Sequence, residues 1–434
     1  MKKTTKDFLV IGLALFAMFF GAGNLIFPPY LGKLTGSKFV LATLGFVVTG
    51  VGLPFLGILA CTKTNGNFND MAGRVSRSFA IVCSIAIFLA IGPMLAIPRT
   101  AATTYELTIQ PVFPWMSSMV SMILYFALNL CFVLRPSRVI DNIGKFLTPA
   151  LLIALLILIV KGAVSPIGNV IDTNMSSVFS NSLIEGYQTM DALAGLMFAT
   201  VITSSVIQKG YKGDEAISIT IKSGLIAILG LAIVYGGLMY LGAQTSSILP
   251  KDISKTALLL EISKRSLGGY GSIIIGIAMG LACFTTSIGL ITAGSSFFDN
   301  ISNGKLPYKI NAIVISLVSI AIGNFGVDKI VKISGPVLCI LYPVAITLTL
   351  MTLSKNLSKN NFVLRVPVYT SLIFSIIETL PSMGVDGGFL KELLNVIPLS
   401  SIGFAWVTPT LLSLVLALFI TKGKESKSNK ILES

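Results

Sequence analysis

Two short segments place polar and helix-breaking residues inside long apolar runs. The first is Gly21-Ala22-Gly23-Asn24, which is followed by Pro28 and Pro29. Glycine and proline disfavour a helix interior, so we expect the helix to unwind here. Unwound backbone is tolerated in a bilayer only where it faces protein or a polar cavity, and its free amides and carbonyls could hold a polar ligand. The alternative is a proline kink with small packing residues.

The second segment is Asp191-Ala192-Leu193-Ala194-Gly195, with Glu185 a short way before it. A carboxylate this deep in an apolar run is costly, and it marks a functional site or a paired charge. The alternative is that Glu185 and Asp191 belong to a loop and that the span begins later. Breaks at corresponding places in two halves of a chain indicate a transporter built from inverted repeats.

A third polar segment places several hydroxyl groups together inside an apolar run. It is Ala282-Cys283-Phe284-Thr285-Thr286-Ser287, whose hydroxyl oxygens could bind a hard cation or simply bond back to their own helix. The chain has no histidine, which removes the commonest metal ligand and proton relay. Its 5 cysteines are widely separated, so neither a disulfide framework nor a zinc site is expected.

The composition places these segments in a membrane protein. Of the 434 residues, 54% are hydrophobic and 12% are charged, against about 25% charged in soluble domains. The mean hydropathy is +0.87, which excludes a soluble enzyme or a nucleic-acid-binding protein. The sequence contains about twelve runs long enough to cross a bilayer, from Phe8–Leu31 to Ile402–Thr421. No cleavage site follows the first run, so we interpret it as a retained span.

The positive charges indicate the orientation of the chain. Of the 32 Lys and Arg residues, 21 lie on the side of the N-terminus when the loops are assigned alternately to the two sides. Lys and Arg are enriched in cytoplasmic loops. We therefore expect a multi-pass protein of the cell membrane with both termini in the cytoplasm. The loop Ser165–Asn181 would lie outside, and Pro250–Tyr270 would form an amphipathic helix over the entrance.

Four segments together resemble the branched-chain amino acid carriers, which are bacterial cation symporters for leucine, isoleucine and valine. They are FGAGNLIFPP in the first run, IGPMLAIPRTAATTYE at 91–106, GYQTMDALAG at 186–195 and LACFTTSIGLITAGSSFF at 281–298. The resemblance implies an all-α polytopic membrane protein with the leucine-transporter-like fold. That fold has twelve transmembrane helices: a 5+5 inverted repeat with discontinuous first and sixth helices, plus two additional helices.

On this basis we expect a single membrane transport domain over residues 1–434. Its parts would be a first five-helix repeat at 7–164, a second at 183–353, two additional helices at 364–421 and a cytoplasmic tail at 422–434. The resemblance implies a carrier and not an enzyme. It also implies that no cofactor is needed apart from sodium as the coupling ion.

The chemistry of a zwitterion suggests which residues would bind the substrate. Free amides at the positive start of a half-helix would take the carboxylate, and unpaired carbonyls with apolar walls in the sixth run would take the ammonium and the side chain. A missing methylene costs only about 1–3 kcal/mol, so the three branched substrates should share one site. The predicted residues are Ala22, Gly23, Asn24, Leu25, Ala192, Leu193, Ala194, Gly195 and Leu196.

The resemblance also implies a sodium site. Ala282, Thr285 and Thr286 match an A-x-x-T-[TS] pattern that lines such a site, and carbonyls of Ala17 and Phe20 would complete it. Proton coupling through Asp191 or Glu185 is the alternative, as is another small amino acid or amine as the substrate. The expected partners are the three amino acids, sodium and the lipid bilayer, with no nucleic acid.

Arg99, near the end of the third run, has two interpretations. We prefer an interfacial arginine whose charged end reaches the membrane surface. The second is an extracellular gate in which Arg99 pairs with Asp191 or Glu106.

A membrane-embedded enzyme and a channel are two other classes of protein, and the sequence disfavours both. It has neither HExxH nor GxSxG enzyme motifs. It also lacks a TVGYG-type channel filter.

Overall fold

The computed structural model describes residues 3–432 except 65, 135–137, 355–356, 358–359 and 386–387. Within the helices, the described side chains exclude those at 3–6, 17, 138–148, 200–201, 204–205, 208, 389–391, 393 and 423–432. Over these described ranges the chain is helical, with turns and loops and no strand. This confirms the all-α prediction.

The chain forms two compact units that alternate along the sequence. Unit 1 comprises Met1–Val51, Phe88–Asp191 and Lys222–Gly335, and unit 2 comprises Gly52–Ile87, Ala192–Ile221 and Pro336–Ser434. Unit 1 contains α1 (Lys3–Phe19), α2 (Ala22–Thr35), η1 (Gly36–Lys38), α3 (Phe39–Val47), η3 (Ala90–Met94), α7 (Ala96–Thr104), η4 (Tyr105–Ile109), α8 (Gln110–Val112), α9 (Ser118–Val133), α10 (Arg138–Val164), α11 (Val178–Tyr187), α14 (Lys255–Ile301) and α15 (Tyr308–Gly323).

Unit 2 contains the later helices and two helices from the segment Gly52–Ile87. They are α4 (Leu53–Thr62), α5 (Phe68–Gly73), α17 (Asn361–Thr379), η6 (Leu380–Met383), α18 (Gly388–Val396), η7 (Ser400–Ile402) and α19 (Val407–Leu432). Five elements continue from one unit into the other: η2 (Val48–Gly52), α6 (Arg77–Leu89), α12 (Asp191–Gln208), α13 (Gly213–Gln244) and α16 (Val327–Leu353). The predicted division into two repeats concerns internal symmetry and stays a prediction.

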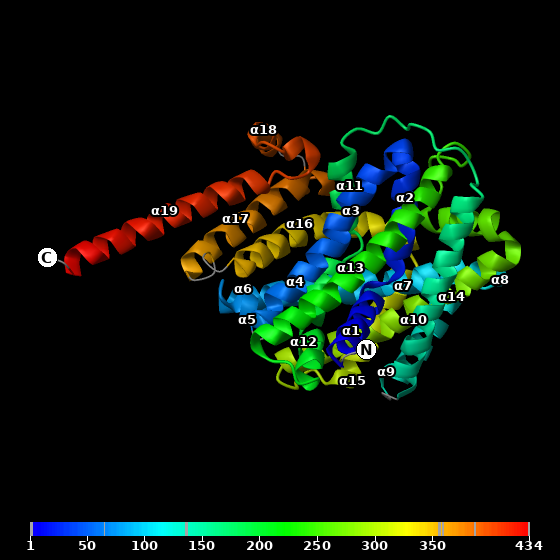
Figure 1. Cartoon of the computed structure of the whole chain (residues 1–434), viewed down its shortest axis with the longest axis horizontal. Helices are drawn as coiled ribbons and strands as arrows, with labels where there is room; N and C mark the ends of the chain where they lie inside the picture. Colours follow the sequence, from blue (N-terminus) through cyan, green and yellow to red (C-terminus); the bar gives the residue numbers. More distant parts are fainter. Residues whose placement is uncertain are drawn as a thin grey trace. The chain divides into compact units, whose positions relative to one another are not determined.

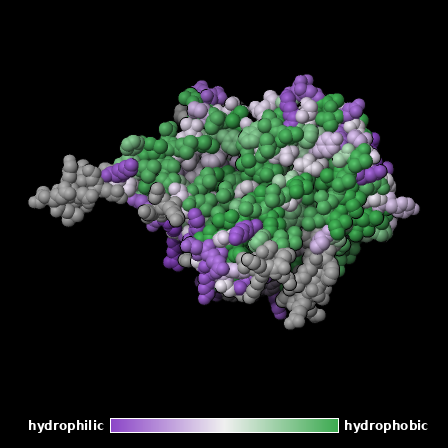
Figure 2. Space-filling view, in the orientation of Figure 1, coloured by the Kyte–Doolittle hydropathy of each residue, from purple (hydrophilic) through white to green (hydrophobic). Residues whose placement is uncertain are grey.

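Many of the helices are suited to a bilayer. Six helical stretches are long and apolar enough to cross one: Ala22–Thr62, Arg77–Val112, Gly213–Gln244, Lys255–Ile301, Val327–Leu353 and Asn361–Met383. Shorter apolar helices lie at Asp7–Phe16, Ser118–Val133, Pro149–Val164, Tyr308–Gly323 and Val407–Lys422. Leu225, Leu229 and Ile233 of α13 are exposed, and hydrophobic side chains cover the face along this helix (Figure 2). A multi-pass membrane protein is thereby supported, and the count of twelve stays a prediction.

Within unit 1, glycines allow helices to meet at backbone distance. A Cβ atom on Gly32 of α2 would collide with the Met239 carbonyl of α13, and one on Gly242 would collide with the Pro29 carbonyl. The short helix α11 packs on α3 (Figure 1), where the Thr49 hydroxyl just beyond α3 donates to the Leu183 carbonyl at 2.8 Å. These contacts hold α2 and α11 in the body of unit 1.

Within unit 2, α17 and α19 run side by side (Figure 1). The Glu378 carboxylate near the end of α17 accepts a hydrogen bond from the Ala405 amide, before α19, at 2.8 Å. Near the other end of α17, the Arg365 side chain donates to the Arg74 carbonyl at 3.3 Å. Hydrogen bonds therefore hold both ends of α17 to other segments of unit 2.

Two interruptions in the helices lie near the predicted breaks. Between α1 and α2, Phe20 and Gly21 are not helical, and Gly21 is extended with φ −119° and ψ −167°. Between α11 and α12, Met190 has a φ of +64°, which is rare for a residue with a side chain. The first interruption is thus confirmed, with α2 already begun at Ala22.

The second interruption is not where the sequence predicts it. We expected unwound backbone and free carbonyls over Ala192–Ala194, but these residues lie inside α12, and the non-helical residues are 188–190. Gly195 is also helical, and a Cβ atom there would come within 2.8 Å of the Pro54 carbonyl. Gly195 therefore serves close helix packing in unit 2 and not unwinding.

The predicted helix in Pro250–Tyr270 is present. It begins at Lys255, where the Ser254 side chain accepts a hydrogen bond from the Ala257 amide, and Gly268 with a φ of +75° bends it into the rest of α14. Leu258, Leu259 and Ile262 are buried. The helix is therefore amphipathic and anchored by its apolar side.

Candidate functional site

Asn24 connects the first interruption to the rest of unit 1. It lies in the first turn of α2, and its side chain is 1% exposed. Its Oδ1 atom accepts a hydrogen bond from the Gly21 amide at 3.2 Å, which caps the restarted helix. Its Nδ2 atom donates to the Asp191 carboxylate at 2.5 Å and also to the Tyr235 hydroxyl of α13. One side chain thus joins α2 to α12 and α13.

Asp191 forms the other side of this contact. It is the first residue of α12, where a carboxylate interacts favourably with the helix dipole, and it is 5% exposed. Its amide donates to the Thr189 hydroxyl at 3.3 Å. The alternative that Asp191 belongs to a loop and that the span begins later is therefore wrong, because α12 begins at Asp191. The carboxylate is buried beside both interruptions.

Arg99 of α7 holds the second interruption through the backbone. Its guanidinium donates to the Gln188 carbonyl at 2.6 Å and to the Thr189 carbonyl at 3.4 Å, and it lies over the Phe27 ring at 5.3 Å. The residue is 3% exposed, so our preferred interpretation of an interfacial, surface-reaching arginine is wrong. Burying this charge requires such partners.

The same guanidinium also touches the first interruption. A Cβ atom on Gly23 would lie 2.8 Å from Arg99 Nη2, closer than Cβ atoms approach their non-bonded neighbours. Glycine at this position therefore lets the guanidinium lie against the first turn of α2. Arg99 brings a positive charge to the place where the amides of a helix start have no partners within the helix.

Glu106, the other predicted partner of Arg99, is engaged elsewhere. Its carboxylate accepts hydrogen bonds from the Thr256 hydroxyl at 2.5 Å and from the Val327 amide at 2.9 Å. It therefore ties the start of α14 and the start of α16 to η4. A gate formed by Arg99 and Asp191 stays a prediction.

Three residues of this site were not predicted from the sequence. Tyr235 accepts from Asn24, and Gln188 accepts a hydrogen bond from the Ser334 hydroxyl of α16 at 2.7 Å. A tyrosine hydroxyl within an apolar span needs a polar partner, which was a usable signal for Tyr235. Gln188 lies inside the GYQTMDALAG segment, whereas Ser334 has no distinguishing signal in the sequence.

The predicted substrate residues fall into two sets. Ala22, Gly23, Asn24 and Leu25 form the first turn of α2 in unit 1 and are buried. Ala192, Leu193, Ala194, Gly195 and Leu196 lie in α12 and belong to unit 2. The carbonyls of Gln188 and Thr189 lie within the second interruption, and they accept hydrogen bonds from Arg99. A role of these nine residues in binding stays a prediction.

The predicted sodium ligands lie partly together. A Cβ atom on Gly21 would be 3.6 Å from Thr286 Cγ2 and 3.9 Å from its Oγ1, so Thr286 of α14 adjoins the first interruption. Thr285 donates back to the Ala282 carbonyl at 2.9 Å, and Phe20 is the last residue before Gly21. Ala17 lies outside the described residues. Among the side chains that the structure describes, no cluster of three His, Cys, Asp or Glu residues could hold a metal.

Comparison with known proteins agrees with the resemblance in the sequence. A family described as "Branched-chain amino acid transport protein" matches residues 4–424. The chain is 36% identical to the branched-chain amino acid permease BraB of Bacillus subtilis, over 97% of each chain. It is 37% identical to the permease BrnQ of the same organism, over 97% of this chain and 99% of the relative.

Solved structures support the fold. The inward-facing structure of Mhp1 matches 96% of this chain and 91% of its own, with a TM-score of 0.62 and 14% identity. MhsT in complex with L-phenylalanine matches 94% of this chain and 98% of its own, with a TM-score of 0.54 and 14% identity. These similarities show the leucine-transporter-like fold, and the relatives are permeases and carriers rather than enzymes. The chain belongs to the branched-chain amino acid transport protein family.

Proposed function

We propose that the protein is a secondary active symporter that brings leucine, isoleucine and valine into the cell by alternating access, coupled to sodium. It would lie in the cell membrane with both termini in the cytoplasm. The observation that carries the proposal is the Asn24–Asp191 contact, which joins the two interruptions at a buried charge. Discontinuous helices that present free backbone groups are typical binding sites of carriers with repeated halves.

The charges beside the interruptions suit the two ends of an amino acid. The substrate carboxylate would bind the guanidinium of Arg99 and the first amides of α2, next to Gly23. The substrate ammonium would bind the Asp191 carboxylate, which now accepts from Asn24. Both charged groups are buried, so each contributes more to binding than it would in water.

Apolar and aromatic side chains around these charges favour an aliphatic substrate. Leu25, Ile26 and Phe27 are fully buried in α2, and the Tyr235 ring packs edge-on against Phe46 at 5.3 Å. A polar side chain brought to such surroundings would lose its hydrogen bonds to water. Leucine, isoleucine and valine differ by single methylene groups or by branching, so one site would accept all three.

Sodium coupling is supported by the position of Thr286 beside Gly21. The hydroxyls of Thr285 and Thr286, the carbonyls of Phe20 and Ala282, and the predicted Ala17 would supply the oxygen atoms. Because the interruption that would receive the carboxylate also adjoins this site, bound sodium would favour one arrangement of the first helix. Coupling requires that sodium binds one conformation of the protein more tightly than another, and this arrangement would meet that requirement.

Proton coupling is the second candidate, because Asp191 is a buried carboxyl group that accepts a hydrogen bond from the Asn24 side-chain amide. The two candidates are separated by uptake of radiolabelled leucine into liposomes that contain the purified protein. An inward sodium gradient without a pH gradient should drive accumulation, and valine and isoleucine should compete better than alanine or proline. Equal accumulation under a pH gradient without sodium would contradict sodium coupling. Counterflow of internal leucine would separate a carrier from a channel.

A further inference from the structure

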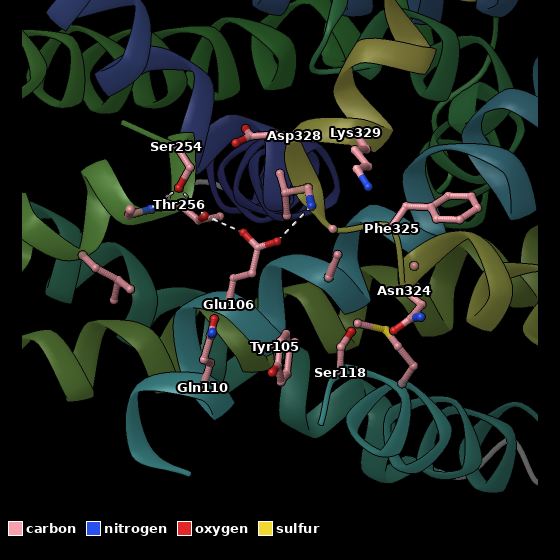
Figure 3. Close-up of a pocket in the computed structure, with 17 residues that line it drawn as sticks. Tyr105, Glu106, Gln110, Ser118, Ser254, Thr256, Asn324, Phe325, Asp328 and Lys329 are labelled. Atoms are coloured by element: carbon pink, nitrogen blue, oxygen red, sulfur yellow. Dashed lines mark hydrogen bonds between the residues drawn. The ribbon is translucent and has the colours of Figure 1, made fainter. Parts of the chain in front are cut away.

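We propose that a second cavity, named here the Glu106 cavity, binds a small zwitterion with an apolar side chain, the chemical class of a neutral amino acid. It has a volume of about 510 Å³ and lies where η4, the start of α14 and the turn between α15 and α16 meet (Figure 3). The inference rests on the proposed function, because it assigns the same class of molecule to a second place in unit 1.

The cavity is separate from the Asn24–Asp191 site. Neither residue lines it, and Arg99 does not line it either. Glu106 follows Arg99 by seven positions, which is about 10 Å along a helix. The cavity is therefore about two turns farther along the third run than the site that holds both interruptions.

Glu106 supplies a fixed negative pole. Its two carboxylate oxygens accept from the Thr256 hydroxyl at 2.5 Å and from the Val327 amide at 2.9 Å, as Figure 3 shows. A carboxylate has about four lone-pair positions, so these two bonds leave room to accept an ammonium. Because both existing partners belong to the walls of the cavity, the carboxylate is held in one orientation before a ligand arrives.

Lys329 supplies a positive pole. Its side chain lines the cavity on the side of Phe325 (Figure 3). Among the residues that the structure describes, Lys329 forms no ion pair, whereas the neighbouring Asp328, which also lines the cavity, lies 3.9 Å from Lys255. The Lys329 ammonium can therefore bind a carboxylate without first giving up a protein partner.

The remaining walls are apolar enough for an aliphatic side chain. Tyr105, Met122, Leu260 and Phe325 line the cavity together with the charged groups. Its volume falls in the range of about 300–1,000 Å³ that small-molecule sites occupy. Opposite charges beside an apolar wall match a neutral amino acid with an apolar side chain, whereas a simple anion or cation would use only one pole.

The test is the number of L-leucine molecules bound per chain at saturation, measured with radiolabelled L-leucine on the purified full-length protein in sodium buffer. The wild type should bind two. Lys329→Gln should bind one leucine tightly, and its affinity for leucine in the Glu106 cavity should be about 10- to 100-fold lower. Lys332→Gln changes a lysine of the same helix that does not line the cavity, and it should still bind two. One molecule per chain in the wild type, unchanged in Lys329→Gln, would overturn the proposal.

Two further variants separate the two sites. Asp191→Asn should weaken leucine binding at the interruptions about 10- to 100-fold and leave binding in the Glu106 cavity unchanged, whereas Lys329→Gln should do the reverse. If the wild type binds one leucine that only Lys329→Gln removes, the Glu106 cavity stands and the proposed central site fails. Lys329→Arg keeps the positive charge and should bind two leucine molecules per chain. The thermal unfolding temperature of each variant shows whether it is folded. Loss of binding in Lys329→Arg at unchanged stability would also contradict the proposal.

Discussion

The side-chain amide of Asn24 lies 2.5 Å from a carboxylate oxygen of Asp191, although the two residues are 167 positions apart in the chain. Each residue lies in the first turn of a helix that restarts after an interruption. The contact therefore fastens one helix start to the other and holds a buried carboxylate between them. In the proposed function, a substrate ammonium that binds Asp191 would change this contact.

Asp191→Asn tests the negative pole of the proposed central site. The variant keeps the shape of the side chain and removes its charge, so the substrate ammonium loses a charge-assisted hydrogen bond worth about 1.5–3 kcal/mol. We expect the KM for leucine uptake to rise about 10- to 100-fold. The matched control is Asp172→Asn, an exposed carboxylate 3.7 Å from Lys38, which should leave KM unchanged. An unaltered KM in Asp191→Asn would remove Asp191 from the site.

Gly23→Ala tests the approach of Arg99 to the first interruption. The new Cβ atom would meet Arg99 Nη2 at 2.8 Å, and the end of a long side chain can move away at little cost in stability. We therefore expect near-normal thermal stability with leucine uptake reduced at least tenfold. Gly289→Ala is the control, because a Cβ atom there has no neighbour within 4 Å among the described residues. Normal uptake by Gly23→Ala would show that the position of Arg99 is unimportant.

Thr286→Val tests the proposed sodium site. Valine keeps the branched shape and removes the hydroxyl oxygen beside Gly21, so the sodium concentration for half-maximal leucine uptake should rise about tenfold, the effect of one lost ligand worth about 1–2 kcal/mol. Thr370→Val removes a hydroxyl that bonds within its own helix in α17 and should have no effect. The same sodium dependence in both variants would exclude Thr286 as a ligand.

Glu106→Ala tests the anchoring of α14 and α16. The variant leaves the Val327 amide without its 2.9 Å acceptor, so the first turn of α16 should open more readily. Loss of a hydrogen bond to a charged group corresponds to about 1.5–3 kcal/mol of local stability. Hydrogen exchange of peptides covering Val327 should accelerate, whereas Glu261→Ala, which removes an exposed pair with Arg265, should not affect them. Equal exchange in the two variants would contradict the anchoring role.

The first interruption was largely predictable from local sequence. Two glycines and an asparagine indicated unwinding, and the structure has it at Phe20 and Gly21. The small displacement has a physical cause, because Asn24 reaches back to the Gly21 amide and lets Ala22 begin a helix. Pro28 and Pro29 lie inside α2 without ending it.

The second interruption shows the limit of local propensity. The prediction of unwinding at Ala192–Ala194 depended on Gly195 and was wrong. A glycine that allows close contact with Pro54 cannot be distinguished in the sequence from a glycine that allows a helix to unwind. The actual bend includes Met190 with a φ of +64°, a conformation that methionine does not favour. Tertiary contacts such as those of Arg99 with Gln188 and Thr189 hold this backbone.

The environment of Arg99 could not be derived from the sequence. An arginine near the end of an apolar run is compatible with the membrane surface or with a buried site, and the choice depends on which helices surround it. Its partners are backbone carbonyls nearly 90 positions away, which have no side-chain signature. Arg99 lies in one of the segments that carry the family resemblance, and Gln188 and Thr189 lie in another. The resemblance does not show that these two segments are in contact.

The most direct test of the central claim is an experimental structure of the protein with L-leucine and sodium bound. We predict leucine beside the two interruptions, with its ammonium within hydrogen-bonding distance of the Asp191 carboxylate and its carboxylate at the Arg99 guanidinium and the first amides of α2. Leucine bound with its two ends reversed, or bound away from both Asn24 and Asp191, would contradict the claim.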